Sequence, residues 1–472
     1  METTLDPQQV CADWQQLHDI LSPWGQTHVL QFWDRLSSES QQHLAEQIRS
    51  IDFELLARLG SRSADSQDTA QLTDRADPPA ACRPQELQAD EREAAHTAGA
   101  HLLRSGRCGV VIVAGGQGSR LGFEHPKGMY PIGPVSQASL FQILVEKIRA
   151  TGERYETSLP LYLMTSPATH QETVDFFAAH DRFGLAEDDL FIFCQGTLPG
   201  VDQSGRLLLS APDTIFMSPD GHGGMVTALR RSGALDHMRQ RSVEHLFYCQ
   251  VDNALVDLPG EEFLGYHLIS ESDVTTQVVA KSDPLEKVGN VVSIDDRLHI
   301  IEYSDLPESA AQLRCEDGRL RLWAGNLAVH AFRVSFLAAS CEGETRLPFH
   351  VAHKKIAFVN SDGQTEKPTV PNGIKYEQFI FDLLPRAAKS IVVEVQADEC
   401  FAPLKNAAGK DSPDDVRQKM SHLYRRWLTE AGIDVPPDMV LEISPLAALG
   451  PEDLQHVVPC ERHAGSWYIG RA

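Results

Sequence analysis

The chain has 472 residues, of which 42% are hydrophobic and 23% are charged, and its formal net charge is −24. A length above the ~250–300 residues at which single cores stop growing predicts two or three domains. The negative charge and the scarcity of basic clusters argue against a nucleic-acid backbone or an anionic membrane as the main partner.

The 9 cysteines are dispersed and form no C-x-x-C pair, which is typical of reduced thiols rather than of a disulfide framework. The N-terminus shows no basic region followed by an apolar stretch, and no segment approaches the ~20 apolar residues of a membrane span. We therefore expect a cytoplasmic protein.

Residues 5–60 are predicted to be helical, because apolar residues recur there at three- and four-residue spacing. A polar, proline-containing stretch at about 61–86 is predicted to be a linker or surface loop, and another helix follows at about 87–104. Together these elements make up a predicted helical N-terminal region, residues 1–105.

From residue 108 onward, short apolar runs such as "GVVIVAG" and "LPLYLMTS" alternate with helical stretches such as "SLFQILVEKIRAT". This alternation predicts βαβ units and an α/β fold with a mostly parallel sheet over residues 106–382. Ligands bind beyond the carboxyl ends of the strands in such sheets, so the loops after 113, 165, 195 and 251 should line one crevice. A smaller mixed domain is predicted for residues 383–472.

The first strand leads into "AGGQGSRLG", which is rich in glycine. The dinucleotide pattern G-x-G-x-x-G fails because Leu121 stands where its third glycine belongs. The P-loop pattern fails because the only "GK", at 409–410, is followed by Asp411. What remains is a glycine turn with Arg120 and Lys127, which suits a polyphosphate in nucleotidyl transfer, although a plain strand-to-helix turn with solvent-facing cations is the alternative.

The stretch "VVIVAGGQGSRLGFEHPKGMY", followed by "SLFQ", resembles the eukaryotic-type UDP-sugar pyrophosphorylase family, and the resemblance runs from about Trp33 to Met420. It implies a Rossmann-like nucleotidyltransferase domain with a mixed, mostly parallel sheet, a helical N-terminal region and a small C-terminal domain. The implied reaction joins UTP and N-acetylglucosamine 1-phosphate, with Mg²⁺ as cofactor, to give UDP-N-acetylglucosamine and diphosphate. The substrates it implies are UTP and a hexose 1-phosphate, and we expect a monomer or weak homo-oligomer.

The resemblance carries individual roles to matching positions. On the nucleotide side these are Gly115 and Gly116 against the uridine, Gln195 as uracil reader, Pro219 and Gly221 in a closing loop, Arg120, Lys127 and Lys405 on the phosphates, and Asp252 on Mg²⁺. On the sugar side they are His222, Gly289, Glu302, Tyr303, Asn326, Lys375, Phe379 and Phe381. The implied attack of a sugar phosphate on the α-phosphorus needs no side-chain nucleophile, so charge neutralisation and positioning should account for most of the rate.

One position departs from the acetamido-sugar pattern. His222 stands where that arm of the family has asparagine, and "GHG" is more like the UDP-glucose and broad UDP-sugar arms. Gly224 and the segments "EYS", "AGN" and "PNGIK" follow the acetamido pattern, so N-acetylglucosamine 1-phosphate is the expected substrate. A UDP-glucose or broad-specificity pyrophosphorylase is the first alternative, and a catalytically silent nucleotide-sugar-binding protein is the second.

Overall fold

The computed structural model describes residues 7–62, 72–341, 347–456, 461–463 and 465–471. Their contacts divide the chain into two compact units. The small unit comprises the described residues within Met1–Asp68, Gly196–Gly224 and Leu347–Ile380. The sheet unit comprises those within Thr69–Gln195, Met225–Arg346 and Phe381–Ala472.

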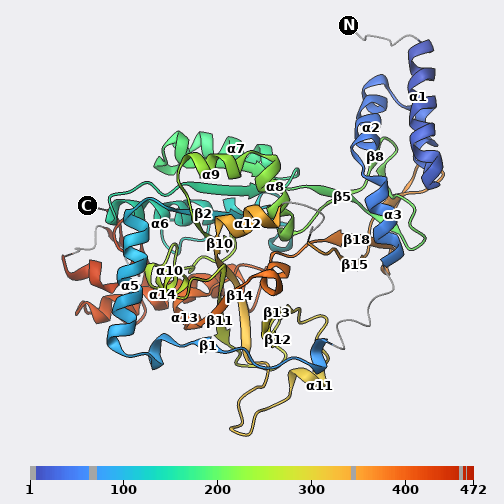
Figure 1. Cartoon of the computed structure of the whole chain (residues 1–472). Helices are drawn as coiled ribbons and strands as arrows, with labels where there is room; N and C mark the ends of the chain where they lie inside the picture. The colour runs from blue at the N-terminus through green and yellow to red at the C-terminus, as the bar shows by residue number, and fades with distance from the viewer. Residues whose placement is uncertain (1–6, 63–71, 342–346, 457–460, 464, 472) are drawn as a thin grey trace. The chain divides into compact units, whose positions relative to one another are not determined.

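A large sheet forms the centre of the sheet unit (Figure 1). Its strands lie in the order β1 (Ala81–Cys82), β19 (Ser390–Glu394), β11 (Val274–Ala280), β14 (Ala324–Arg333), β10 (His245–Gln250), β2 (Cys108–Val113), β3 (Leu161–Thr165) and β4 (Leu190–Cys194). Only β14 runs antiparallel to its neighbours on this path, β10 and β11. A hairpin of β12 (Asn290–Ile294) and β13 (Arg297–Ile301) joins β14 at its start. The predicted mixed, mostly parallel α/β fold is therefore confirmed.

The sheet unit also contains α-helices, several of which cover the large sheet. They are α5 (Ala89–Arg104), α6 (Leu140–Arg154), α7 (His170–Ala179), α8 (Met225–Arg231), α9 (Ala234–Gln240), α10 (Glu261–Ile269), α11 (Glu308–Ala311), α12 (Val334–Ser340), α13 (Ala397–Cys400) and α14 (Pro413–Glu430). Ser139 caps α6, because its side chain accepts a hydrogen bond from the N–H of Gln142. Leu144 on α6 and Val110 on β2 are fully buried in one core, as expected for a strand covered on its faces.

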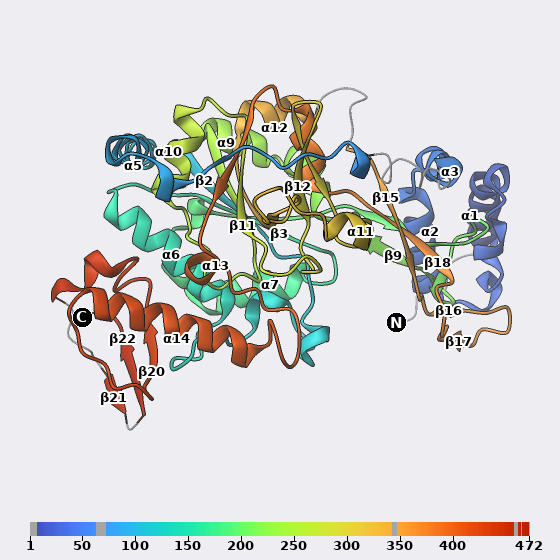
Figure 2. The ribbon, with the colours of Figure 1, turned by 90° about the horizontal axis from the view of Figure 1, so that it is seen from below.

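The last part of the sheet unit holds a separate three-stranded sheet. It consists of β20 (Val440–Ile443), β22 (Ser466–Ile469) and β21 (Glu461–His463). Figure 2 shows α14 alongside these strands, and Leu423 of α14 shares the main core with Leu441 and Ile469. This C-terminal segment is thus continuous in packing with the large sheet.

The small unit combines N-terminal helices with short strands from the middle of the chain. Its elements are α1 (Pro7–Leu21), α2 (Ser38–Ser50), α3 (Phe53–Arg62), β5 (Thr197–Pro199), β6 (Val201–Asp202), β7 (Leu209–Ala211), β8 (Thr214–Ile215), β9 (Met217–Pro219), β15 (His350–Lys354), β16 (Phe358–Val359), β17 (Thr365–Glu366) and β18 (Gly373–Glu377). Leu44 and Ile48 of α2 pack in one core with Val201 and Tyr376. The helical N-terminus is as predicted.

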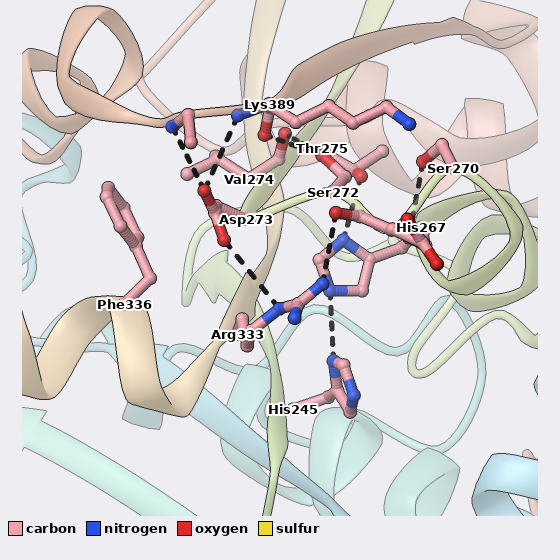
Figure 3. Close-up of polar contacts among 12 residues, drawn as sticks. His245, His267, Ser270, Ser272, Asp273, Val274, Thr275, Arg333, Phe336 and Lys389 are labelled. Atoms are coloured by element: carbon pink, nitrogen blue, oxygen red, sulfur yellow. Dashed lines mark hydrogen bonds and ion pairs between the residues drawn. The ribbon is translucent and has the colours of Figure 1, made fainter.

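A buried polar network lies at the amino end of β10 (Figure 3). His245 Nδ1 lies 3.0 Å from His267 Nε2, and His267 Nδ1 lies 2.8 Å from the Thr275 hydroxyl. Burial lowers the pKa of His267 to about 3 and that of His245 to about 4, so both imidazoles are neutral at physiological pH. Arg333 lies 3.7 Å from Asp273 beside them. The network joins β10, α10 and β11 at the edge away from the carboxyl ends of the strands.

No helix among the described residues is both long and apolar enough to cross a membrane. The domain boundaries at 105 and 382 stay predictions. Part of the predicted linker at 61–86 falls on residues 63–71, which lie outside the described residues.

Candidate active site

The predicted nucleotide and metal residues of the sheet unit gather at one edge of its sheet. β2, β3, β4 and β10 run parallel, so their carboxyl ends share this edge. β14 runs antiparallel to β10, so its first residues lie there as well. The expected crevice loops after residues 113, 165 and 251 therefore do converge, as does Gln195, the last residue before the chain passes to the small unit.

The glycine loop after β2 folds back on itself. Lys127 donates its N–H to the Gly116 carbonyl at 3.0 Å, and Gly118 donates to the His125 carbonyl at 2.9 Å. Within the described part of the chain, the N–H groups of Gly115, Gly116 and Gln117 donate to no acceptor. Consecutive N–H groups without a protein acceptor can bind an anion, so this turn is suited to phosphate oxygens.

Gln195 lies directly against this loop. It is 8% exposed, and its N–H donates to the Thr165 carbonyl at 2.9 Å. A Cβ on Gly115 would come within 3.3 Å of Gln195 Oε1, so a side chain at Gly115 would crowd the amide. Ser166 donates to the Gly115 carbonyl at 2.8 Å from the other side. The sequence analysis did not single out Ser166, although it directly follows a predicted strand.

Lys127 and Asp252 form an ion pair at the same edge. Lys127 Nζ lies 3.4 Å from Asp252 Oδ2, and their side chains are only 20% and 13% exposed. Arg120 lies in the loop between β2 and Lys127. It is exposed, and it forms no ion pair with the residues that the structure describes. A mostly buried cation and an exposed cation thus flank the loop whose N–H groups are unsatisfied.

Asn253 holds the Asp252 turn to the segment that ends at Lys405. Its amide donates to the Cys400 carbonyl at 2.8 Å, and its Oδ1 accepts from the Ala402 N–H at 2.9 Å. The Asp252 carbonyl in turn accepts the N–H of Leu404 at 2.8 Å. These bonds bring Lys405 to the Asp252 turn from about 150 residues away. Asn253 received no role in the sequence analysis, although it directly follows the predicted Mg²⁺ ligand Asp252.

Three predicted sugar residues meet at the start of β14. A Cβ on Gly289 would lie 3.1 Å from Glu302 Oε1 and 3.8 Å from Asn326 Cβ. Asn326 donates its N–H to the Gly289 carbonyl at 2.8 Å. The neighbouring Tyr303 is 48% exposed, whereas Phe381 is 5% exposed. Carboxylate and amide groups therefore converge where hydroxyl groups of a ligand could be bound.

The predicted sugar residues of the small unit form a second set. Ile380 donates its N–H to His222 Nδ1 at 3.2 Å, so the ring proton of the neutral imidazole is on Nε2. The His222 ring stacks on Phe379 with 5.3 Å between centroids. Burial, with a smaller contribution from His350, lowers the pKa of His222 to about 4. Lys375 Nζ lies 5.0 Å from the centre of the Phe216 ring. Burial lowers the pKa of the Lys375 ammonium group.

The loop that carries His222 is held by backbone contacts. Asp220 donates its N–H to the Gly196 carbonyl at 3.1 Å, and Gln378 donates to the Asp220 carbonyl at 2.7 Å. Gly221 has φ +85°, a conformation that favours glycine. Pro219 pairs with Thr197 at the end of β9. Backbone hydrogen bonds at Asp220 and the positive φ of Gly221 therefore fix the conformation of the loop that carries His222.

Asp252 is the predicted Mg²⁺ ligand, and its carboxylate suits that role. Within the described ranges, no three histidine, cysteine or acidic side chains are grouped as a metal site would require. Mg²⁺ prefers oxygen ligands and often takes only one or two protein carboxylates, with substrate phosphates and water as its other ligands. The edge therefore fits a metal shared with a nucleotide rather than one held by protein ligands alone.

Known proteins match this chain over most of its length. Residues 58–463 match the family described as UTP–glucose-1-phosphate uridylyltransferase. The human UDP-N-acetylhexosamine pyrophosphorylase-like protein 1 is 35% identical, with 94% of each chain covered. UDP-N-acetylglucosamine diphosphorylase 2 of Arabidopsis thaliana is also 35% identical, over 95% of this chain and 93% of its own length.

A solved structure agrees with these sequence matches. The uridine diphosphate N-acetylglucosamine pyrophosphorylase of Trypanosoma brucei, solved with an inhibitor, superposes with a TM-score of 0.81 and 26% identity over 94% of each chain. The resemblance found in the sequence is thereby confirmed. The chain belongs to the UTP–glucose-1-phosphate uridylyltransferase family and is a nucleotidyltransferase.

Proposed function

We propose that this enzyme transfers the uridylyl group of UTP to N-acetylglucosamine 1-phosphate, giving UDP-N-acetylglucosamine and diphosphate. The observation that carries the transfer reaction is the glycine loop with its unsatisfied N–H groups, bordered by Gln195 and by the Lys127–Asp252 pair. The relatives named for N-acetylhexosamine and N-acetylglucosamine support this choice of sugar.

The reaction needs charge neutralisation more than proton transfer. A phosphate oxygen of the sugar 1-phosphate attacks the α-phosphorus, and the new O–P bond forms as the bond to the bridging oxygen breaks. Diphosphate leaves with that electron pair. Two polyanions must approach each other, so fixed cations lower the barrier. Arg120, Lys127 and Lys405 supply the positive charge in this proposal, and the backbone N–H groups of the loop position the nucleotide.

Asp252 would hold Mg²⁺, which neutralises phosphate oxygens when it is bound. Lys127 fixes the direction of this carboxylate through their 3.4 Å contact. Asn253 fixes the turn itself through its two hydrogen bonds to the backbone at 400 and 402. We therefore assign Asn253 as a positioning residue for the metal ligand.

On the sugar side, Glu302 and Asn326 would bind hydroxyl groups beside the Gly289 backbone, with Tyr303 exposed next to them. His222, Lys375, Phe379 and Phe381 complete the proposed set. The neutral His222 ring offers an N–H donor at Nε2. A glucose-specific or broad enzyme is the second candidate, favoured by this histidine and by the family's own description. A silent nucleotide-sugar-binding protein is disfavoured, because Arg120, Lys127, Asp252 and Lys405 are all present.

An omission assay tests the proposed reaction. Diphosphate release should require UTP, Mg²⁺ and N-acetylglucosamine 1-phosphate together, and leaving out any one of them should abolish it. Binding of UDP-N-acetylglucosamine without turnover of any hexose 1-phosphate would support the silent alternative instead. We further propose a cytoplasmic protein, on the composition and cysteine pattern of the sequence, and a monomer or weak homo-oligomer as its assembly.

A further inference from the structure

A cavity of about 450 Å³ lies within the sheet unit, apart from every residue assigned above to substrate or metal. α6, α10 and α14 contribute its walls, together with the segments that follow β10, β19 and β20. This volume is in the range of sites that bind small molecules. The residues that line it decide which chemical class it suits.

The basic side chains that line the cavity are already engaged. Lys147 Nζ donates to the carbonyls of Ala254 at 3.0 Å and Val256 at 2.7 Å. Arg154 Nη1 lies 3.6 Å from Glu452, and Arg426 Nη2 lies 3.2 Å from Glu399. His96 Nε2 lies 3.2 Å from Glu261. A bound anion would therefore have to compete with existing partners for every one of these groups.

Acidic side chains outnumber these bases. The lining includes Asp257, Glu261, Glu262, Glu394, Glu399, Glu430 and Glu452 against Lys147, Arg154 and Arg426. Such an excess of carboxylates gives the interior a negative potential, which attracts cations.

Asp257 is one of the two lining acids, with Glu430, that form no hydrogen bond or ion pair with the residues that the structure describes. Solvent reaches this residue from the cavity, and its carboxylate lies against Gly260. No residue within the described ranges donates a hydrogen bond to that carboxylate or lies close enough for an ion pair. Desolvation by the cavity wall, with the nearby Glu261, raises the pKa of Asp257 to about 6, and the charges of Lys147 and Arg154 oppose this shift. An exposed carboxylate in the wall of the cavity is open to a charge-assisted contact with a cationic ligand.

Aromatic rings form part of the wall, together with aliphatic side chains. Tyr155, Phe263, Tyr266, Tyr424 and Trp427 all line the cavity. The Tyr424 and Trp427 rings pack edge to face with 5.7 Å between centroids. Aromatic faces bind organic cations and also cover the apolar body that carries the charge. A divalent metal ion prefers a shell of oxygen ligands to such rings.

We propose that this cavity is a binding site for a small organic cation, an amine on an aromatic or apolar body, with Asp257 as its counter-ion. The site adjoins the catalytic edge through the backbone. Asp257 follows the segment 254–256 that Lys147 holds, and Asp252 lies in the turn just before that segment. Cys400, which also lines the cavity, accepts the Asn253 amide from the same turn. A ligand here would therefore contact the segment that directly follows the Asp252 turn.

Calorimetric titration with 2-phenylethylammonium tests the proposal on the whole chain, without UTP or Mg²⁺, so the outcome does not depend on the uridylyltransferase assignment. The neutral control is 2-phenylethanol, which has the same ring and chain length. The amine should bind about tenfold tighter or more, because a charge-assisted contact replaces a neutral one. Equal affinities, or no binding of the amine, would overturn the proposal.

The variant Asp257→Asn keeps the shape of the side chain and removes its charge. It should lower the affinity for the amine about tenfold and leave the affinity for the alcohol unchanged. The matched control is Asp438→Asn, which removes an exposed carboxylate outside the lining and should change neither affinity. Thermal unfolding of both variants verifies that they are folded. An unchanged amine affinity in folded Asp257→Asn would overturn the role of Asp257.

Discussion

Lys127 Nζ lies 3.4 Å from Asp252 Oδ2, and this contact joins the loop after β2 to the turn after the neighbouring parallel strand β10. Both side chains are mostly buried. The pair therefore places a cation and the proposed metal-binding carboxylate at one point of the sheet edge, beside the N–H groups of Gly116 and Gln117. The proposed reaction needs the cation to neutralise phosphate charge and the carboxylate to hold Mg²⁺.

Replacing Lys127 with methionine removes the charge and keeps most of the side-chain volume. We expect kcat to fall about 100-fold or more, because a donor aimed at transition-state charge contributes on this scale. Steady-state kinetics with saturating UTP and sugar 1-phosphate measures the effect. A near-normal kcat would mean that Lys127 only orients Asp252.

Replacing Asp252 with asparagine should raise the Mg²⁺ concentration for half-maximal activity about tenfold or more, because an ionised oxygen ligand is lost. Asp438→Asn is the control and should leave the metal titration unchanged, since that side chain is exposed outside the site. If Asp252→Asn also left the titration unchanged, the metal ligand would lie elsewhere.

Replacing His222 with asparagine tests the position that departs from the acetamido pattern. An amide oxygen can still accept the Ile380 N–H, but the smaller side chain loses the stacking on Phe379. We expect the ratio of kcat/KM for N-acetylglucosamine 1-phosphate over glucose 1-phosphate to rise about tenfold, within the range that pocket contacts provide. An unchanged ratio would show that this loop does not set the preference.

Acid should destabilise the fold through His245 and His267. Their folded-state pKa values, about 4 and about 3, lie below the ordinary histidine value of about 6.5. The unfolded chain then binds more protons, so stability is complete above pH ~6.5 and falls as the pH drops below it. The facing charges are Arg333 and Asp273 on one side, and Glu244 and Arg107 on the other.

Urea unfolding at several pH values measures this dependence. Near pH ~5 the loss should reach about 2 kcal/mol for each imidazole, since each pH unit is worth about 1.4 kcal/mol per proton. His245→Gln should be less stable at neutral pH but lose stability less steeply on acidification. The same slope in both proteins would contradict this account of the histidine pair.

The sheet and the order of the motifs could be predicted because they depend on local patterns. Strand β2 is a continuous apolar run, and the glycine loop, Gln195 and the Asp252 turn each come at the end of such a run. The contact of Gln195 with Gly115, and the bonds from Asn253 to residues 400 and 402, depend on strand order and on chain separation. Spacing within one sequence carries no such information.

The core of the small unit could not be predicted from the sequence for the same reason. Its core joins Leu44 on α2 to Val201 and Tyr376, which lie far apart along the chain. Periodicity marks each segment as apolar but does not identify its partner. The cavity beside Asp257 was equally invisible, since in the sequence Asp257 is one acid within an apolar loop.

The most direct test of the proposed function is a side-by-side measurement of kcat/KM for the 1-phosphates of N-acetylglucosamine, N-acetylgalactosamine and glucose, with UTP and Mg²⁺. The account predicts diphosphate release with all required components and the highest kcat/KM for N-acetylglucosamine 1-phosphate. A higher value for glucose 1-phosphate, or no turnover with any of the three, would contradict it.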